Sequence, residues 1–153
     1  MLPDGLDDLY QEIILDHYKR PHNRGTVDGA ELKAEGYNPF CGDQITLTAH
    51  VDSNGLITDV GLEGQGCAIS QASASMMSDH LKGHTLEEVA SLSHLFREMM
   101  HDHEVTDAEE EQLEDLAALQ GVKKFPVRIK CALLAWATVD DAIAEYRKTH
   151  ASS

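Results

Sequence analysis

The segment from residue 44 to 52 constrains the fold more than any other part of the chain. Its apolar residues are Ile45, Leu47, Ala49 and Val51, and they alternate with Thr46, Thr48 and His50. A period of two predicts a β-strand with one buried face and one wet face. Ser53, Asn54 and Gly55 follow, and they predict a hairpin turn because asparagine and glycine tolerate positive φ.

Two further strands are expected beside this one. The segment of about 31–36 precedes it, and the segment 56–63 runs back from the turn with Ile57 and Val60 available for the core. Strands joined by a tight hairpin pair antiparallel. We therefore expect a three-stranded antiparallel sheet.

The rest of the chain has helical periodicity. Residues 4–19, with Leu6, Leu9, Ile13 and Ile14 on one face, predict a helix that Pro21 ends, and 68–81 and 127–148 predict two more. Two capping boxes, Thr85 with Glu88 and Thr106 with Glu109, predict helices that end near His101 and before Gly121. A group of strands followed by helices predicts an α+β fold, with the helices packed on one face of the sheet, in one domain over 1–153.

Charge narrows the possible partners. The chain has 12 Lys and Arg against 27 Asp and Glu, a net charge of −15. Such a field repels nucleic acid and anionic membranes and favours a partner with a basic surface, although acidity that only aids solubility is equally compatible. The acidic N-terminus carries no targeting signal, and no run approaches the roughly 18 apolar residues that span a bilayer, so we expect a cytoplasmic protein.

Three cysteines lie far apart in the sequence, and an odd count argues against a disulfide framework. Cys41 stands between Pro39 and Gly42 and two residues before Asp43, an unusual setting for a buried structural thiol. Cys67 follows Gly64-Gln65-Gly66 at an expected helix start, where the helix dipole favours a thiolate, but a plain glycine-rich turn is the alternative. Cys131 lies near Arg128 and Lys130 on the last expected helix, and cations lower the pKa of a thiol. Taken alone, however, Cys131 is better explained as a packing residue in the apolar stripe of that helix, which consists of Val127, Cys131, Leu134, Val139 and Ile143.

Taken together, these residues supply three thiols and one carboxylate, the right number and type for tetrahedral zinc. Their spacing matches no zinc finger, so composition alone does not establish a metal site.

Three motifs in order then resemble one family over nearly the whole length. They are 38–43 (NPFCGD), 64–73 (GQGCAISQAS) and 128–136 (RIKCALLAW), and Asp16-His17-Tyr18 with Pro21 and Asn23 resembles the family's N-terminal signature. The chain looks like the SufU branch of the IscU/NifU-like iron–sulfur cluster assembly family. Three departures from the IscU branch indicate SufU: Lys130 replaces a histidine, Phe125-Pro126-Val127-Arg128 replaces a chaperone-docking motif, and an extra acidic helix lies around Glu109 to Leu119.

The resemblance implies a SufE/NifU-like fold and one zinc ion on Cys41, Asp43, Cys67 and Cys131. It also implies that Cys41 accepts persulfide sulfur from a SufS-type cysteine desulfurase, with Arg128 steadying the freed thiolate or Asp43, and that a cluster scaffold lies downstream. Two alternatives stay open. The same ligands could bind iron and the nascent cluster, or the zinc could be purely structural in an interaction protein.

Other clusters have simpler explanations. We expect His101 to Glu104 to be a solvated loop, the methionine pairs Met76-Met77 and Met99-Met100 to fill the core, and Glu109-Glu110-Glu111 to be a wet helix face. His17 and Tyr18 belong to the signature, but the sequence assigns them no chemistry.

Overall fold

The computed structural model describes residues 8–39, 42–101 and 103–150. Its strands are β1 (Leu32–Asn38), β2 (Asp43–Val51) and β3 (Ile57–Gln65), and they form the expected antiparallel sheet in the order β1-β2-β3. The helices are α1 (Asp8–Lys19), α2 (Ala68–Leu81), α3 (Leu86–Met100), α4 (Asp107–Leu113) and α5 (Pro126–His150), with a 3₁₀ segment, η1 (Glu114–Lys124), between α4 and α5. The α+β prediction is confirmed.

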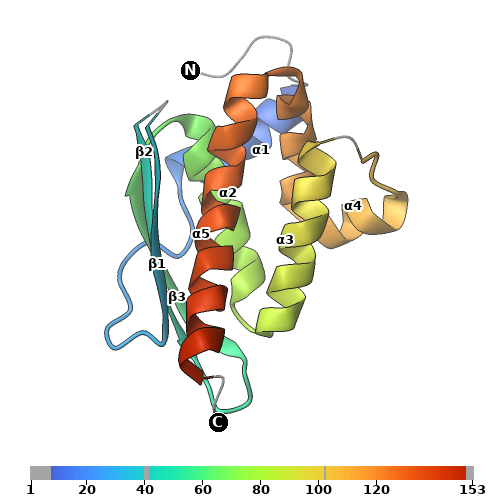
Figure 1. Ribbon diagram of the computed structural model, residues 1–153. Helices are drawn as coiled ribbons and strands as arrows, with labels where there is room; N and C mark the ends of the chain where they lie inside the picture. The colour runs from blue at the N-terminus through green and yellow to red at the C-terminus, as the bar shows by residue number, and fades with distance from the viewer. Residues whose placement is uncertain (1–7, 40–41, 102, 151–153) are drawn as a thin grey trace.

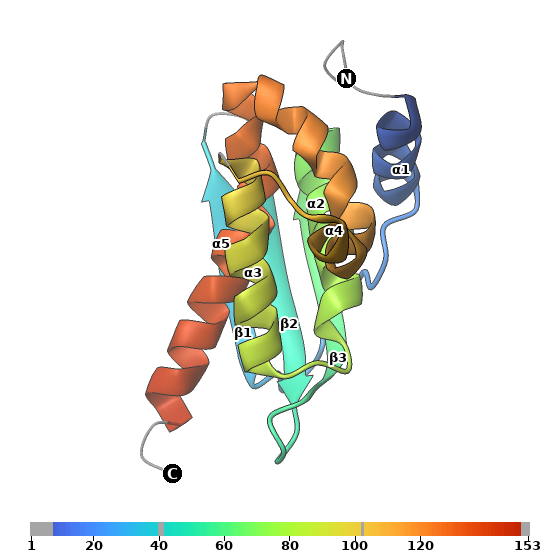
Figure 2. The same ribbon diagram turned by 90° about the vertical axis from the view of Figure 1, so that its right-hand side faces the viewer.

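The helices lie on one side of the sheet (Figures 1 and 2). Helix α5 runs along β1 and β2, α2 lies beside it against β3, and α3 lies on the side of α5 away from the sheet. Between these layers Trp136 of α5 stacks on Phe96 of α3 with ring centroids 5.1 Å apart. Met76, Met77, Met99 and Met100 are buried in this core, as predicted. No helix in the described part of the chain is both long and apolar enough to cross a bilayer.

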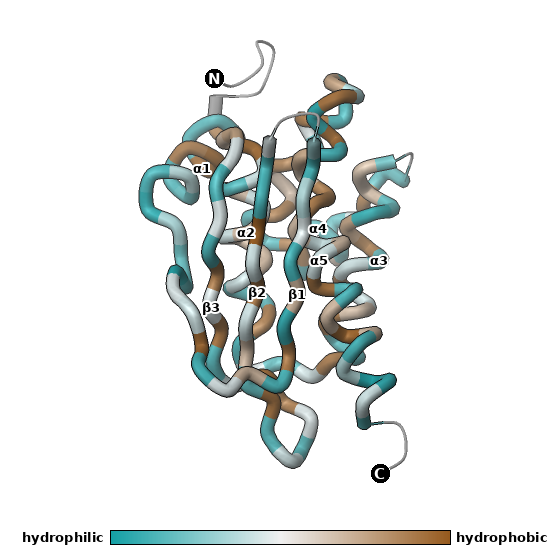
Figure 3. The backbone as a smooth tube through the Cα atoms, turned by 60° about the vertical axis from the view of Figure 1, so that its left-hand side comes forward, coloured by the Kyte–Doolittle hydropathy of each residue, from teal (hydrophilic) through white to brown (hydrophobic). Residues whose placement is uncertain are grey.

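The alternation in β2 orients the sheet as predicted, with one correction. Ile45, Leu47, Ala49 and Val51 are buried beneath the helices. The opposite face is not uniformly wet, because the segment after α1 crosses it: Val27 N–H donates to Thr48 Oγ1 at 2.9 Å, and Thr48 is buried. Figure 3 shows the three strands side by side with the helices behind them.

Two apolar residues lie outside the core, contrary to expectation. Leu9 of α1 and Val127 of α5 have exposed fractions of 59% and 60%. Leu9 is rotated by about 140° from the buried Ile14 on a 3.6-residue helix, so the two cannot share one narrow face. Val127 is the second residue of α5 and lies in the first turn of that helix.

The expected helix from Thr106 to Gly121 is wrong in its second half. Its capping box exists, but α4 ends at Leu113 because Glu114 takes a positive φ of 53°. The chain continues as η1, in which side chains three residues apart share one face. Leu113, Leu116, Leu119 and Val122 have that spacing, and all are fully buried.

Candidate metal centre

The ends of three strands bring the first ligand group together at one edge of the sheet. Asn38, the last residue of β1, pairs with Asp43, the first residue of β2, and Gln44 pairs with Gln65 at the end of β3. The β3 end leads directly into Cys67, the N-cap residue of α2. The N-terminal part of α5, which carries Cys131, approaches this edge from the helical layer (Figure 1).

Three of the four predicted ligands converge there. One carboxylate oxygen of Asp43 and the sulfur atoms of Cys67 and Cys131 all lie within 4.8 Å of one another. Both cysteines are free thiols. Cys41, the fourth predicted ligand, lies outside the described residues, so its place in the group stays a prediction.

Asp43 is the organising residue of this group. Its side chain is fully buried, and its Oδ1 accepts a hydrogen bond of 2.9 Å from the backbone N–H of Cys67. Its Oδ2 faces the Nδ2 of Asn38 at 3.5 Å. Both donors are neutral, and a buried carboxylate in such surroundings is costly unless a cation compensates it.

Asn38 was not singled out as a site residue by the sequence. Its buried amide contacts both Asp43 and the Cys131 sulfur, the latter at 3.8 Å, so it joins two of the predicted ligands. Its register opposite Asp43 becomes visible only when β1 and β2 pair. In the sequence, the only sign of this role is the position of Asn38 inside the first motif, three residues before Cys41.

Gly66 makes room for the carboxylate. Its φ is +148°, and a Cβ atom there would lie 2.2 Å from Asp43 Oδ1 and 2.8 Å from the hydroxyl of Ser70. No side chain fits at this position without moving Asp43. The glycine expected to free the backbone before α2 therefore also provides the space in which the carboxylate lies.

The donor set fits a zinc ion. Two ligands about 2.3 Å from one tetrahedral centre lie roughly 3.8 Å apart. The three ligand atoms here lie within 4.8 Å of one another, which allows them to share one ion. Two thiols and a carboxylate are typical ligands of a borderline-soft divalent cation rather than of magnesium or calcium. Arg128, predicted to act beside this group, is half-buried one turn before Cys131, and its role stays a prediction.

The clusters discounted from the sequence have local partners. His103 Nε2 lies 2.9 Å from Glu109 Oε1, and His101 Nδ1 lies 2.7 Å from the carbonyl oxygen of Arg97 at the end of α3. Glu110 and Glu111 are exposed on α4, as expected, whereas Glu109 is half-buried. His17, by contrast, belongs to a second group with His22 and Asp79 that the sequence did not reveal.

Comparisons with known proteins identify relatives over most of the chain. Residues 9–132 match the family described as the NifU-like N terminal domain. The chain is 44% identical over 141 residues to the zinc-dependent sulfurtransferase SufU of Bacillus subtilis strain 168, covering 92% of this chain and 93% of that protein. It is 43% identical over 138 residues to the iron–sulfur cluster assembly scaffold protein IscU of Streptococcus pyogenes serotype M1, covering 90% and 84%.

The fold is also found in solved structures. One is an iron–sulfur cluster assembly scaffold protein assigned to the SUF system of Fervidobacterium islandicum AW-1, which superposes with a TM-score of 0.78 at 35% identity over 86% of this chain and 94% of that one. The two relatives above carry different activities in their names at nearly the same identity. Overall similarity therefore does not choose between the two activities.

Proposed function

The chain belongs to the family of NifU-like N-terminal domains, and from this premise we propose that it is a zinc-dependent sulfurtransferase that accepts persulfide sulfur from a SufS-type cysteine desulfurase for iron–sulfur cluster assembly. The observation that carries the proposal is the convergence of Asp43, Cys67 and Cys131, with a buried carboxylate among them. The name of the relative with 44% identity supports zinc and sulfur transfer as the chemistry of such a centre.

The ligands would be Cys41, Asp43, Cys67 and Cys131. A bound zinc ion would supply the positive charge that keeps the cysteines as thiolates near neutral pH. Asp43 would keep its hydrogen bond to the start of α2 and so orient the group, and Asn38 would hold the carboxylate and the Cys131 sulfur in place.

Cys41 is the proposed sulfur acceptor. Its thiolate would attack the outer sulfur of the persulfide on the desulfurase cysteine. A new S–S bond would form on Cys41, the S–S bond of the donor would break, and the electron pair would leave with the donor cysteine as its thiolate. The burial of the other thiols supports this choice: Cys131 is fully buried within α5, and Cys67 is half-buried at the start of α2. Arg128 is the proposed cation that steadies the thiolate or Asp43.

The second candidate is a scaffold that binds iron and the nascent cluster on the same ligands. The 43% identity to a scaffold protein favours it, and so does the structural likeness to the Fervidobacterium protein. The two functions differ in what the purified protein contains. One zinc and no colour support the sulfurtransferase, whereas brown protein with iron and sulfide supports the scaffold.

Sulfur transfer itself is tested by incubating each cysteine variant with desulfurase and cysteine, followed by mass spectrometry and zinc analysis. Cys41→Ala should gain no labile sulfur while keeping much of its zinc and its fold. Cys67→Ala and Cys131→Ala should lose zinc first and activity as a consequence. A Cys41→Ala protein that still gains sulfur on Cys67 or Cys131, with zinc in place, would refute the acceptor assignment.

A further inference from the structure

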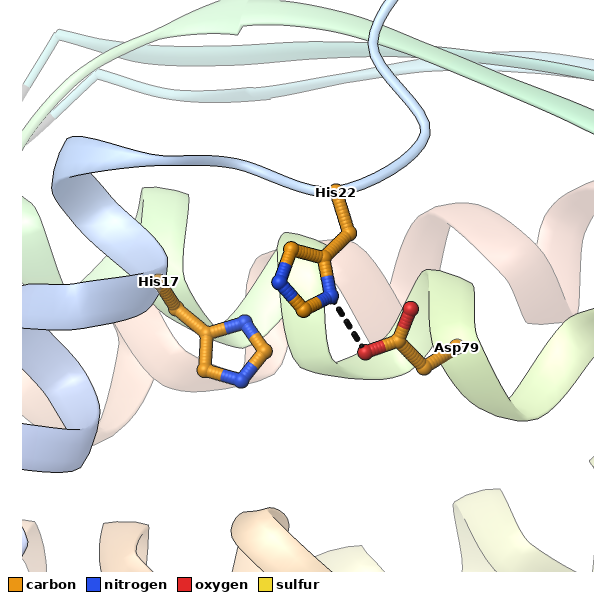
Figure 4. A group of neighbouring side chains, drawn as sticks. All are labelled: His17, His22 and Asp79. Atoms are coloured by element: carbon orange, nitrogen blue, oxygen red, sulfur yellow. Dashed lines mark hydrogen bonds and ion pairs between the residues drawn. The ribbon is translucent and has the colours of Figure 1, made fainter.

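A second group of potential ligands lies apart from the cysteines, where the end of α1 meets α2. One ring nitrogen each of His17 and His22 and one carboxylate oxygen of Asp79 all lie within 4.8 Å of one another. His17 is in the last turns of α1, His22 follows Pro21 in the next segment, and Asp79 is on α2. Figure 4 shows the two imidazole rings side by side, with Asp79 on the far side of His22.

His17 is held so that one particular nitrogen is available. Its side chain is almost fully buried, and its Nε2 lies 2.9 Å from Asp115 Oδ2 of η1. A carboxylate only accepts hydrogen bonds, so this network assigns the ring proton to Nε2. The lone pair is then on Nδ1, which accepts from the Ser75 hydroxyl at 2.8 Å. A carboxylate that fixes the tautomer of a histidine in this way is typical of metal-binding histidines.

His22 and Asp79 are held from behind as well. The backbone N–H of His22 donates to Ser75 Oγ at 2.8 Å, which fastens this segment to α2. Asn23, with a positive φ of 58°, donates from its amide to Ser78 Oγ at 2.9 Å and to Asp79 Oδ1 at 3.3 Å. His22 Nδ1 and Asp79 Oδ2 are 2.6 Å apart, and their side chains are 43% and 44% exposed. An ion can therefore enter from solvent, while the groups that would bind it are already positioned.

We propose that His17, His22 and Asp79 form a second metal site for a divalent transition-metal ion such as zinc or cobalt(II). His17 would bind through Nδ1, His22 through a ring nitrogen and Asp79 through a carboxylate oxygen, with water in the remaining positions. Two imidazoles and one carboxylate suit ions of this class, whereas magnesium prefers carboxylates and water. Ser75 would lose its contact with His17 Nδ1 but would keep the backbone N–H of His22 as a partner.

The test is titration of cobalt(II) into the desalted, tag-free full-length chain, followed by absorption and by NMR of the histidine ring nitrogens. Near-ultraviolet charge-transfer absorption marks cobalt bound to thiolates, so it separates this site from the cysteines. We expect cobalt to bind without that absorption and to broaden the ring signals of His17 and His22 before those of other histidines.

Variants at the exposed ligands avoid disturbing the core. His22→Asn and Asp79→Asn should each weaken this binding roughly tenfold or more, and Asp115→Asn should weaken it about tenfold through the tautomer of His17. His94→Asn is the matched control, because His94 pairs with Glu98 at 3.1 Å on the surface of α3 and its side chain is 76% exposed. Equal weakening by His94→Asn and His22→Asn would overturn the proposal. So would the absence of any cobalt binding that lacks thiolate absorption, since the cluster would then be a hydrogen-bond network only.

Discussion

Asp43 shows how a single residue links the sheet to the proposed chemistry. Its carboxylate is fully buried, its two described donors are neutral, and two thiols lie within 4.8 Å. Without the metal ion the folded state carries the cost of a desolvated carboxylate, and with the ion that same carboxylate becomes a ligand. Removal of the Asp43 charge should therefore stabilise the fold when zinc is absent and destabilise it when zinc is bound.

Asp43→Asn tests this reversal. In zinc-free protein the substitution should raise the free energy of unfolding, on the order of 1 kcal/mol, because the buried charge is gone while the side-chain oxygen can still accept from Cys67 N–H. In zinc-loaded protein it should lower the melting temperature and weaken zinc binding roughly tenfold or more. Melting curves before and after verified zinc removal measure both effects. Destabilisation of the same size in both states would show that Asp43 acts only through its hydrogen bonds.

Gly66 is the second residue that the site requires. Gly66→Ala would place Cβ 2.2 Å from Asp43 Oδ1, so it should destabilise the protein and weaken zinc binding together. Gly83→Ala is the matched control, because its φ of +84° also disfavours a side chain but nothing lies within 4 Å. It should cost about 1–2 kcal/mol of stability and leave zinc binding unchanged. If the two variants bind zinc equally well, Gly66 serves the backbone alone and not the carboxylate.

At the residue scale, the sequence predicted the candidate ligands better than it predicted the residues that hydrogen-bond to them. The predicted ligands Asp43, Cys67 and Cys131 converge, and the sequence could indicate them because thiols and carboxylates are common metal ligands. Asn38 and Ser75 were not predicted as supports, because an amide or hydroxyl becomes informative only when the fold supplies its partner. The same holds for His17, whose neighbours His22, Asp79 and Asp115 come from three separate segments.

At the scale of elements, the sequence predicted correctly those features that depend on residues close together in the chain, such as turns and helix caps. The hairpin turn forms at the expected residues, with Gly55 at a φ of +80°, and both capping boxes are present. The prediction of one continuous α-helix from Thr106 to before Gly121 is wrong in its second half, because tertiary packing determines the geometry of η1. Burial of Leu113, Leu116, Leu119 and Val122 at a spacing of three stabilises a 3₁₀ segment that helix propensity alone does not favour.

The capping box of α3 offers a test at this scale. Thr85 Oγ1 accepts from Glu88 N–H at 3.1 Å, and Glu88 in return accepts from Thr85 N–H at 2.9 Å, which lowers the pKa of Glu88. Thr85→Ala should reduce the free energy of unfolding by about 1 kcal/mol without affecting zinc. Thr106→Ala removes the matching cap of the short helix α4 and should cost less, because α4 makes fewer contacts with the core. Urea unfolding of both variants measures the difference, and an equal or reversed order would contradict it.

The whole molecule adds a property that no single element has. A charge of −15 on 153 residues gives the molecule a net negative field. The partner proposed for Cys41 is another protein, and a field of this sign accelerates encounter with a basic surface. The alternative is that the acidity serves solubility only. The two explanations differ in the association rate that they predict: only attraction to a basic partner makes that rate depend on salt.

Association with the desulfurase should therefore slow as salt rises. Exposed charges are screened over about 10 Å at 0.1 M salt, and charges of this kind act mainly on the association rate rather than on dissociation. Stopped-flow measurement of both rates over a salt series should give a falling association rate and a nearly constant dissociation rate. The double variant Glu110→Gln, Glu111→Gln removes two exposed negative charges from α4 and should flatten the salt dependence, whereas Glu110→Asp, Glu111→Asp keeps the charge and should not. Association that does not change with salt, in the parent chain and in both variants, would leave solubility as the role of the acidic surface.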